Sequence, residues 1–192
     1  MISNMKEDAI INQAKKLMQK MTQKNKAPEW LLTEIAVSKG EKLCKKYNVN
    51  RRIVITALYL AHIIFDTKIG GKTQKEHPKL SAKQAKKYLK QWGLNKGEEE
   101  IILNSIEAHH EHVATKSLEA EVVKNAECFK FLELRGTLIH LHALGKRDME
   151  FEDSIKEVKR KMEQKYNYLT LPDCKKEGTK NRKHILNLLN NI

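Results

Sequence analysis

Apolar residues recur at helical spacing along most of the chain. In residues 6–24 they form one stripe that repeats every three to four positions, as expected for the buried face of a helix. The stripe consists of Ile10, Ala14, Leu17, Met18 and Met21. A second helix of this kind is predicted to begin at Pro28 and to run toward Tyr47, because the fixed φ of proline suits the first turn of a helix.

The most apolar stretch of the chain lies between residues 53 and 65. Asn50 is a suitable N-cap, so we predict a helix from Arg51 to about Asp66. Its Ile and Val content would also suit a strand, but its length favours a helix. Because this segment is apolar on nearly every face, we expect other helices to surround it.

The remaining pattern predicts further helices separated by polar or glycine-containing segments. A loop is expected over 67–79, which holds Gly70, Gly71 and Pro78, and a polar loop over 172–180. The predicted helices are 81–92, 95–110, 117–131 or on to 144, 152–168, and 181–190. Ser81, Asn95 and Ser117 are their expected N-caps, since side-chain oxygens at that position accept from free backbone N–H groups. The chain is therefore predicted to be all-α, with about seven to nine helices.

Composition agrees with a single helical domain. The 192 residues are 40% hydrophobic and 32% charged, with only eight Gly and three Pro, which argues against collagen and most β-sandwiches. The longest apolar stretch, residues 53–65, is shorter than the roughly 20 residues that span a bilayer, so no membrane partner is expected. Glu7 and Asp8 interrupt the place of a signal peptide, and the three cysteines form no CxxC pair. We therefore expect a cytoplasmic protein with reduced thiols.

The net charge of +13 is compatible with phosphate-bearing partners. Arginine occurs at only six positions, so lysine carries most of this charge, whereas proteins that read nucleic acid favour the bidentate arginine fork. The lysine excess favours a solvated surface, and nucleic-acid binding stays open as the alternative.

Histidines and acids at two helix ends are candidates for chemistry. His62 lies in the most apolar helix with Asp66 four residues later, one turn away on the same face. Together they offer half of a metal or general-base site, or a hydrogen bond that satisfies a core histidine. His109 and His110 end the 95–110 helix on its apolar side, whereas His77 alone is a weak signal.

Glu127 is the second acid that shares a face with core residues. Val123 precedes it by four positions and Phe131 follows by four. A buried carboxylate takes up a proton or a cation. The alternative is a bond from Glu127 to a lysine or a histidine within the core.

These residues and the sequence around them resemble the motifs of the HD-domain superfamily of metal-dependent phosphohydrolases. His77 stands in HPKLSAKQAKKYLKQWGL, His109 and His110 in ILNSIEAHHEHV, and Glu127 in VVKNAECFKFLE. The resemblance covers roughly residues 30–134 and implies an HD-domain-like helical bundle with its core at 28–145. Residues 1–27 would pack on that core as an N-terminal helix, and 146–192 would form a basic C-terminal extension.

The chain departs from the family pattern at three places. No histidine stands near Leu32, where the family has an early one. The His-Asp dyad is broken in either possible alignment. If His62 is its histidine, Ile63 stands in place of the aspartate; if Asp66 is its aspartate, Phe65 stands in place of the histidine. The sequence does not choose between these two registers. The final aspartate of the family is replaced by Glu127, which keeps the charge on a longer arm.

The resemblance implies a divalent metal held by some of these residues, and leaves open that the pocket has lost it. The candidate ligands are His62, Asp66, His77, His109, His110 and Glu127. This mixed nitrogen and oxygen set suits Fe, Mn, Zn or Ni, with Mg as a further possibility. Asp66 or Glu127 would act on the attacking water, and nearby Lys72, Lys75 and Lys124 would bind phosphate.

Three functions follow from this reading. The first is a metal-dependent phosphohydrolase acting on a nucleotide or a small phosphoester. The second is a catalytically degenerate module that binds a nucleotide, a nucleic acid or a protein partner. The third is a helical bundle whose histidines only bond within the core. A homo-oligomer through the outer helices stays open in each case.

Overall fold

The computed structural model of the chain describes residues 2–65, 72–110 and 113–192. Within these ranges it contains nine helices and no strand, which confirms the all-α prediction. The helices are α1 (Ile2–Asn25), α2 (Trp30–Tyr47), α3 (Arg51–Leu60), α4 (Lys72–Gln91), α5 (Lys96–Ala108), α6 (Leu118–Cys128), α7 (Leu134–Gly145), α8 (Phe151–Asn167) and α9 (Pro172–Leu189).

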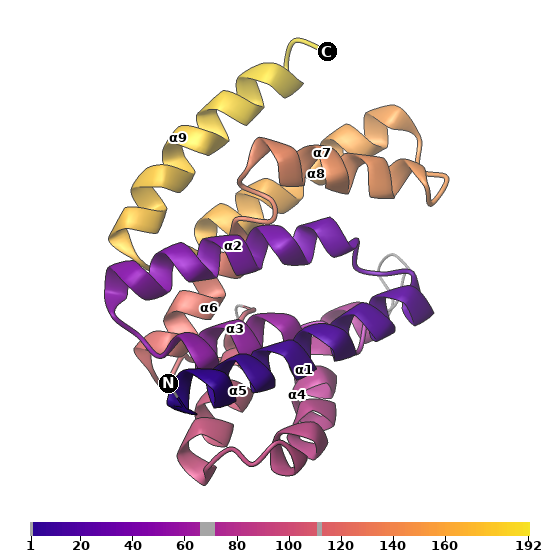
Figure 1. Cartoon of the computed structure of the whole chain (residues 1–192). Coiled ribbons are helices and arrows are strands. Elements are labelled where there is room, and N and C mark those ends of the chain that lie inside the picture. The colour runs from indigo at the N-terminus through magenta and orange to yellow at the C-terminus, as the bar shows by residue number, and fades with distance from the viewer. Residues whose placement is uncertain (1, 66–71, 111–112) are drawn as a thin grey trace.

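Helix α3 lies at the centre of the bundle. Every residue from Ile53 to Leu60 is buried, and α1, α2, α5 and α6 all pack against this helix. The expectation that other helices surround the most apolar segment is therefore confirmed. In Figure 1, α2 runs between the group formed by α1, α3, α4 and α5 and the pair α7 and α8, with α9 along the outer edge. One apolar cluster contains residues from Ile11 to Leu189, so both terminal segments share the core.

Three predicted helix starts carry their expected side-chain caps. The side chain of Asn50 accepts a hydrogen bond from the Ile53 N–H at 3.3 Å. Asn95 accepts from Glu98 at 3.0 Å, and Ser117 accepts from Ala120 at 3.1 Å. Each cap satisfies a backbone donor that the first turn of a helix leaves free.

The central helix is shorter than the pattern predicts, because α3 ends at Leu60. The hydroxyl of Ser81 on α4 accepts from the Ile64 N–H at 3.2 Å and lies 3.4 Å from the Ile64 carbonyl oxygen, to which it donates. Contact with another helix thus replaces the helical bonding of this backbone. His62 lies in the turn after α3, so the argument that it shares a helix face with Asp66 is wrong. Asp66 itself lies outside the described residues.

Two predicted loops are helical where the structure describes them. Helix α4 begins at Lys72 and passes through Pro78, although an interior proline lacks one backbone donor and disfavours a helix. Helix α9 begins at Pro172, because proline at the first helical position removes a donor that has no partner there anyway. Gly178 packs so closely on Leu169 that an added Cβ would lie 2.5 Å from its side chain. The predictions of loops over 72–79 and 172–180 were therefore wrong.

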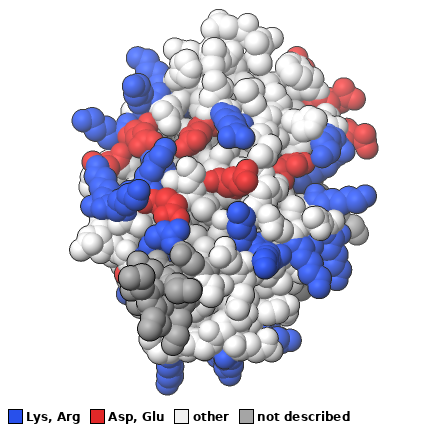
Figure 2. Space-filling view, viewed as in Figure 1, with Lys and Arg blue, Asp and Glu red and all other residues white. Residues whose placement is uncertain are grey.

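Surface charge is distributed rather than gathered in one stripe on the face drawn in Figure 2. Lysine and arginine side chains stand at several separate places, and acidic side chains lie among them across the upper half of this face. The pattern on this face agrees with a solvated lysine surface. None of the described helices combines the length and apolarity that a membrane crossing requires.

Candidate metal centre

Three buried histidines from separate parts of the chain meet at the inner end of the bundle. His62 follows α3, His77 lies on α4, and His109 is the C-cap of α5. They are 9%, 2% and 0% exposed, and one ligand atom from each lies within 4.8 Å of the others. Such a group could hold one metal ion.

The hydrogen bond of His109 fixes which of its nitrogens can bind. Its Nδ1 lies 2.6 Å from the Ile106 carbonyl oxygen, and a carbonyl only accepts, so Nδ1 carries the proton. The lone pair is therefore on Nε2, which lies 3.1 Å from Nε2 of His77. Two nitrogens at about 2.1 Å from one metal are about 3.0 Å apart at a right angle and about 3.4 Å apart at the tetrahedral angle. The observed separation lies within this range, and the backbone bond orients His109 as in many metal sites.

His110 and two aromatic rings enclose the three histidines. The ring centroid of His110 lies 4.5 Å from that of His109 and 4.8 Å from that of His77. Phe65 contacts His77 edge-on at 5.0 Å, and Tyr168 lies 6.5 Å from His110. His110 thus lines the site without belonging to the group of converging ligand atoms.

Glu127 on α6 contacts both a histidine and a lysine within the core. Its Oε2 lies 2.9 Å from Nε2 of His62 and 2.7 Å from Nζ of Lys130. Glu127 is only 2% exposed, and its other oxygen, Oε1, has no hydrogen-bond partner among the described residues. The same holds for Nδ1 of His62. These two buried polar atoms are free to bind a ligand, although Glu127 stands beside the three-histidine group rather than in it.

Burial sets the charge of these groups. It lowers the pKa of His62 well below the usual value, and the ammonium of Lys130 adds to the effect. Burial likewise lowers the pKa of His109, and the pKa of His110 falls through burial and the nearby Lys165. The imidazoles are therefore neutral at pH 7, which is the form that binds metal.

At Glu127, nearby positive groups have a larger effect on the pKa than burial has. Burial by itself would raise its pKa, but the adjacent Lys130, acting together with His109 and Lys165, outweighs burial and the pKa is lowered. Glu127 is therefore an ionised carboxylate next to neutral histidines.

Two lysines on α8 are site residues that the sequence analysis missed. Lys165 is 2% exposed, and its charge acts on His62, His109 and His110. Lys161 lies one turn earlier and is partly buried. The signal was present, because Ile155, Val158, Met162 and Lys165 recur every three or four positions. Lys165 thus lies on the apolar stripe of its helix.

The other predicted site residues lie elsewhere or outside the described part. Lys72 and Lys75 belong to the first turn of α4, but their side chains lie outside the described part of the structure. Asp66 also lies outside the described residues. Lys124 on α6 is half-buried, and no contact joins it to the histidines in the described part of the chain. Asn125 has a structural role, since its side chain bonds to the backbone of Glu121 at 2.9 Å and of Thr170 at 3.1 Å.

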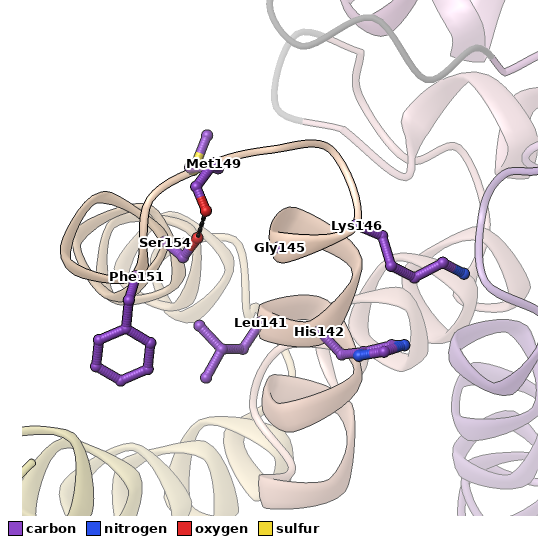
Figure 3. A pocket seen from close by; sticks show the side chains of 7 residues that line it. All are labelled: Leu141, His142, Gly145, Lys146, Met149, Phe151 and Ser154. Carbon is purple, nitrogen blue, oxygen red and sulfur yellow. Dashed lines mark hydrogen bonds between the residues drawn. The ribbon is translucent and has the colours of Figure 1, made fainter.

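A surface pocket lies apart from the histidines, between α7 and α8 (Figure 3). Its lining residues are Leu141, His142, Gly145, Lys146, Met149, Phe151 and Ser154. Ser154 donates to the Met149 carbonyl oxygen at 3.3 Å, and the ring of Phe151 points away from this bond. The pocket contains no carboxylate and none of the clustered histidines, so we assign it no role in the candidate site.

Comparisons with known proteins agree with this arrangement. The model of the HD domain family matches residues 33–131, just over half of the chain. A search of curated proteins found no match. Among solved structures, Bacillus subtilis YpgQ has a TM-score of 0.73 at 15% identity, covering 96% of this chain and 94% of its own. An HD-superfamily hydrolase from Bacillus thuringiensis has a TM-score of 0.70 at 13% identity, covering 96% and 95%. A second YpgQ structure, in complex with ADP, has a TM-score of 0.70 at 15% identity and covers 100% and 95%.

Proposed function

Because the chain belongs to the HD domain family, we propose that it is a metal-dependent phosphohydrolase acting on a nucleotide or another small phosphoester. The observation that carries this proposal is the convergence of three buried imidazoles, whose ligand atoms lie within 4.8 Å of one another. A buried polar atom without a partner is unfavourable, and a bound metal could provide one for Nδ1 of His62 and Oε1 of Glu127, which have none among the described residues. The ADP complex of the similar protein YpgQ motivates a nucleotide as the substrate.

The residues present fit a divalent transition metal. His62, His77 and His109 would hold it, with Glu127 and His110 beside them. A set rich in imidazole suits Zn, Fe, Mn or Ni better than Mg, which prefers oxygen ligands. When bound, such an ion lowers the pKa of a water molecule and polarises a phosphoryl oxygen.

The side chains of the chain itself would handle the water and the phosphate. Glu127 is ionised next to Lys130, so it can accept a hydrogen bond from the attacking water and take up its proton. Asp66 stays the other candidate for this role. Lys72, Lys75 and Lys124 stay candidates for neutralising phosphate charge.

Metal analysis and hydrolysis together test the proposal. Untagged protein is purified, its metal content is measured by mass spectrometry, and phosphate release from nucleotides and an aryl phosphate is followed with Mn, Ni, Zn, Fe or Mg added. We expect about one metal ion per chain and turnover with at least one ion. His77→Ala and His109→Ala should lose both, whereas His184→Ala, an exposed histidine on α9, should lose neither. A protein that binds no metal and hydrolyses nothing with any ion would refute the proposal.

A non-hydrolysing binding module is the second candidate function. Its support is that the His-Asp dyad is broken in either register, since Ile63 follows His62 and Phe65 precedes Asp66. In addition, Glu127 is already paired with Lys130. This alternative predicts binding of ADP without phosphate release under every metal condition. Turnover that depends on His77 and His109 would exclude it.

A further inference from the structure

The last turns of α8 bring two lysines toward the site from outside the region that the family model matches. Nζ of Lys165 lies 5.3 Å from the ring centroid of Tyr168 and 6.0 Å from that of Phe131. Nζ of Lys161 lies 5.6 Å from the Phe131 centroid. Since Tyr168 also faces His110, the Lys165 ammonium stands beside the histidine cluster.

Neither ammonium has an acidic partner in the described part of the chain. Glu127, the buried acid of the site, is paired with Lys130 at 2.7 Å. Glu157, one turn before Lys161, is held by two hydrogen bonds from Arg160 at 2.6 Å. The aromatic rings near the two lysines compensate only part of the unfavourable burial of a cation.

The spacing of the two lysines makes this burial more unfavourable still. Lys161 and Lys165 are four residues apart, so two like charges share one face of α8. Burial is the main cause that lowers the pKa of Lys161 to about 7, and the charge of Lys165 is the second. Burial also lowers the pKa of Lys165. An arrangement that weakens the folded protein in this way is typical of a binding site.

A charge count indicates what the site accepts. Among the described groups, Glu127 and Lys130 balance each other, and Lys161 and Lys165 add up to two positive charges when both are protonated. A divalent metal would add to this excess. A terminal phosphate group carries up to two negative charges and three free oxygens, whereas a phosphodiester carries one charge and two free oxygens. The terminal group therefore compensates the lysines better.

We propose that Lys165 and Lys161 form an anion subsite beside the histidines, which selects substrates with a terminal phosphate over phosphodiesters. The identification of this phosphate as a substrate group rests on the proposed function, whereas the binding of the anion does not. Lys165 would bind the phosphate oxygens directly from its buried position. Lys161, being partly exposed, would complete the subsite at its outer side.

Binding measurements test the subsite without relying on turnover. Calorimetry with inorganic phosphate, phenyl phosphate and dimethyl phosphate is carried out on the full chain, with and without added Mn. We expect phenyl phosphate to bind at least about 10-fold more tightly than dimethyl phosphate. Lys165→Met should weaken phenyl phosphate binding by about 10-fold or more, since a hydrogen bond to a charged group is lost. Lys156→Met removes the same charge from an exposed position on α8 and should leave binding unchanged.

A second readout separates this subsite from a merely structural role. Lys165→Met removes a buried, unpaired charge, so it should raise the melting temperature in phosphate-free buffer while reducing the further rise that phosphate produces. Lys161→Met should weaken binding in the same direction and, being less buried, serves if the first variant does not fold. Equal affinity for the two esters, or unchanged phenyl phosphate binding in both variants, would overturn the subsite. Loss of metal binding and turnover with intact phosphate selectivity would instead count against the proposed function alone.

Discussion

The buried pair of Glu127 and Lys130 gives the sharpest test of how the site is held together. The two side chains are 2% and 3% exposed, and their charged atoms lie 2.7 Å apart. Among the described residues, Lys130→Met leaves the buried Glu127 carboxylate with only the His62 ring, at 2.9 Å, as a hydrogen-bond donor. Removing one partner of a buried ion pair costs about 3–5 kcal/mol. Because His62 still contacts the carboxylate, we expect a loss near the lower limit, about 3 kcal/mol.

The double variant Lys130→Met with Glu127→Gln distinguishes the pair from its packing. It removes both charges, so the unfavourable burial of the carboxylate disappears with the attraction. We expect this variant to lie within about 1 kcal/mol of the natural chain. The single loss would be a large share of a total stability of about 5–15 kcal/mol.

Urea unfolding of metal-free protein, followed by circular dichroism, measures these differences. Lys156→Met is the control, since its partner Asp153 is exposed on the same helix, and it should leave the unfolding midpoint unchanged. A Lys130→Met variant as stable as the natural chain would refute the reasoning. So would a double variant that is no more stable than the single one, because the loss would then come from packing rather than from an unpaired charge.

Three further predictions follow from the same structure. Gly136→Ala should destabilise the chain by about 3 kcal/mol or more in urea unfolding, because an added Cβ would lie 2.1 Å from the Lys130 carbonyl oxygen. At Gly145 an added Cβ meets open space, so Gly145→Ala should stabilise α7 by about 0.5–1 kcal/mol in the same assay. The pKa of Lys161 is lowered to about 7 by burial and by its lysine neighbour, so the unfolded chain binds more protons above that pH. The free energy of unfolding should therefore rise between about pH 7 and about pH 8.5, and a smaller rise in Lys161→Met would confirm the source, whereas an equal rise would exclude it. Zn or Mn at about 100 times its dissociation constant should stabilise the chain by about 2.7 kcal/mol in thermal unfolding; a chelator should reverse this, and His77→Ala, which removes a converging ligand, should abolish it.

Local patterns predicted the helices well where their signals are carried by neighbouring residues. The caps at Asn50, Asn95 and Ser117 lie where the sequence places them, because a cap is a bond between residues two or three positions apart. The predicted membership of the HD-domain family is confirmed by the family match over residues 33–131. The prediction that the central helix continues to about Asp66 was wrong, because α3 ends at Leu60 and the following backbone bonds to the Ser81 hydroxyl of another helix.

The candidate site shows the same division between local and distant information. Its predicted metal ligands stay predictions, although three of them, His62, His77 and His109, meet within 4.8 Å. The sequence indicated which types of residue could act, because histidines and acids are unusual on apolar faces. It left open whether Glu127 bonds to a lysine or a histidine, and the structure shows both, with Lys130 one turn away and His62 from a distant part of the chain.

The sequence by itself determined the all-α class, the central helix and the positions of the imidazoles and acids along it, since periodicity and caps act over one or two turns. Only the tertiary structure decided that His62, from the turn after α3, meets His77 and His109, and that Lys165 of α8 is buried beside them. Helical periodicity fixes which face of a helix is buried, but it does not specify which other helix covers that face. The charge excess beside the histidines therefore became visible only when α8 was packed in place.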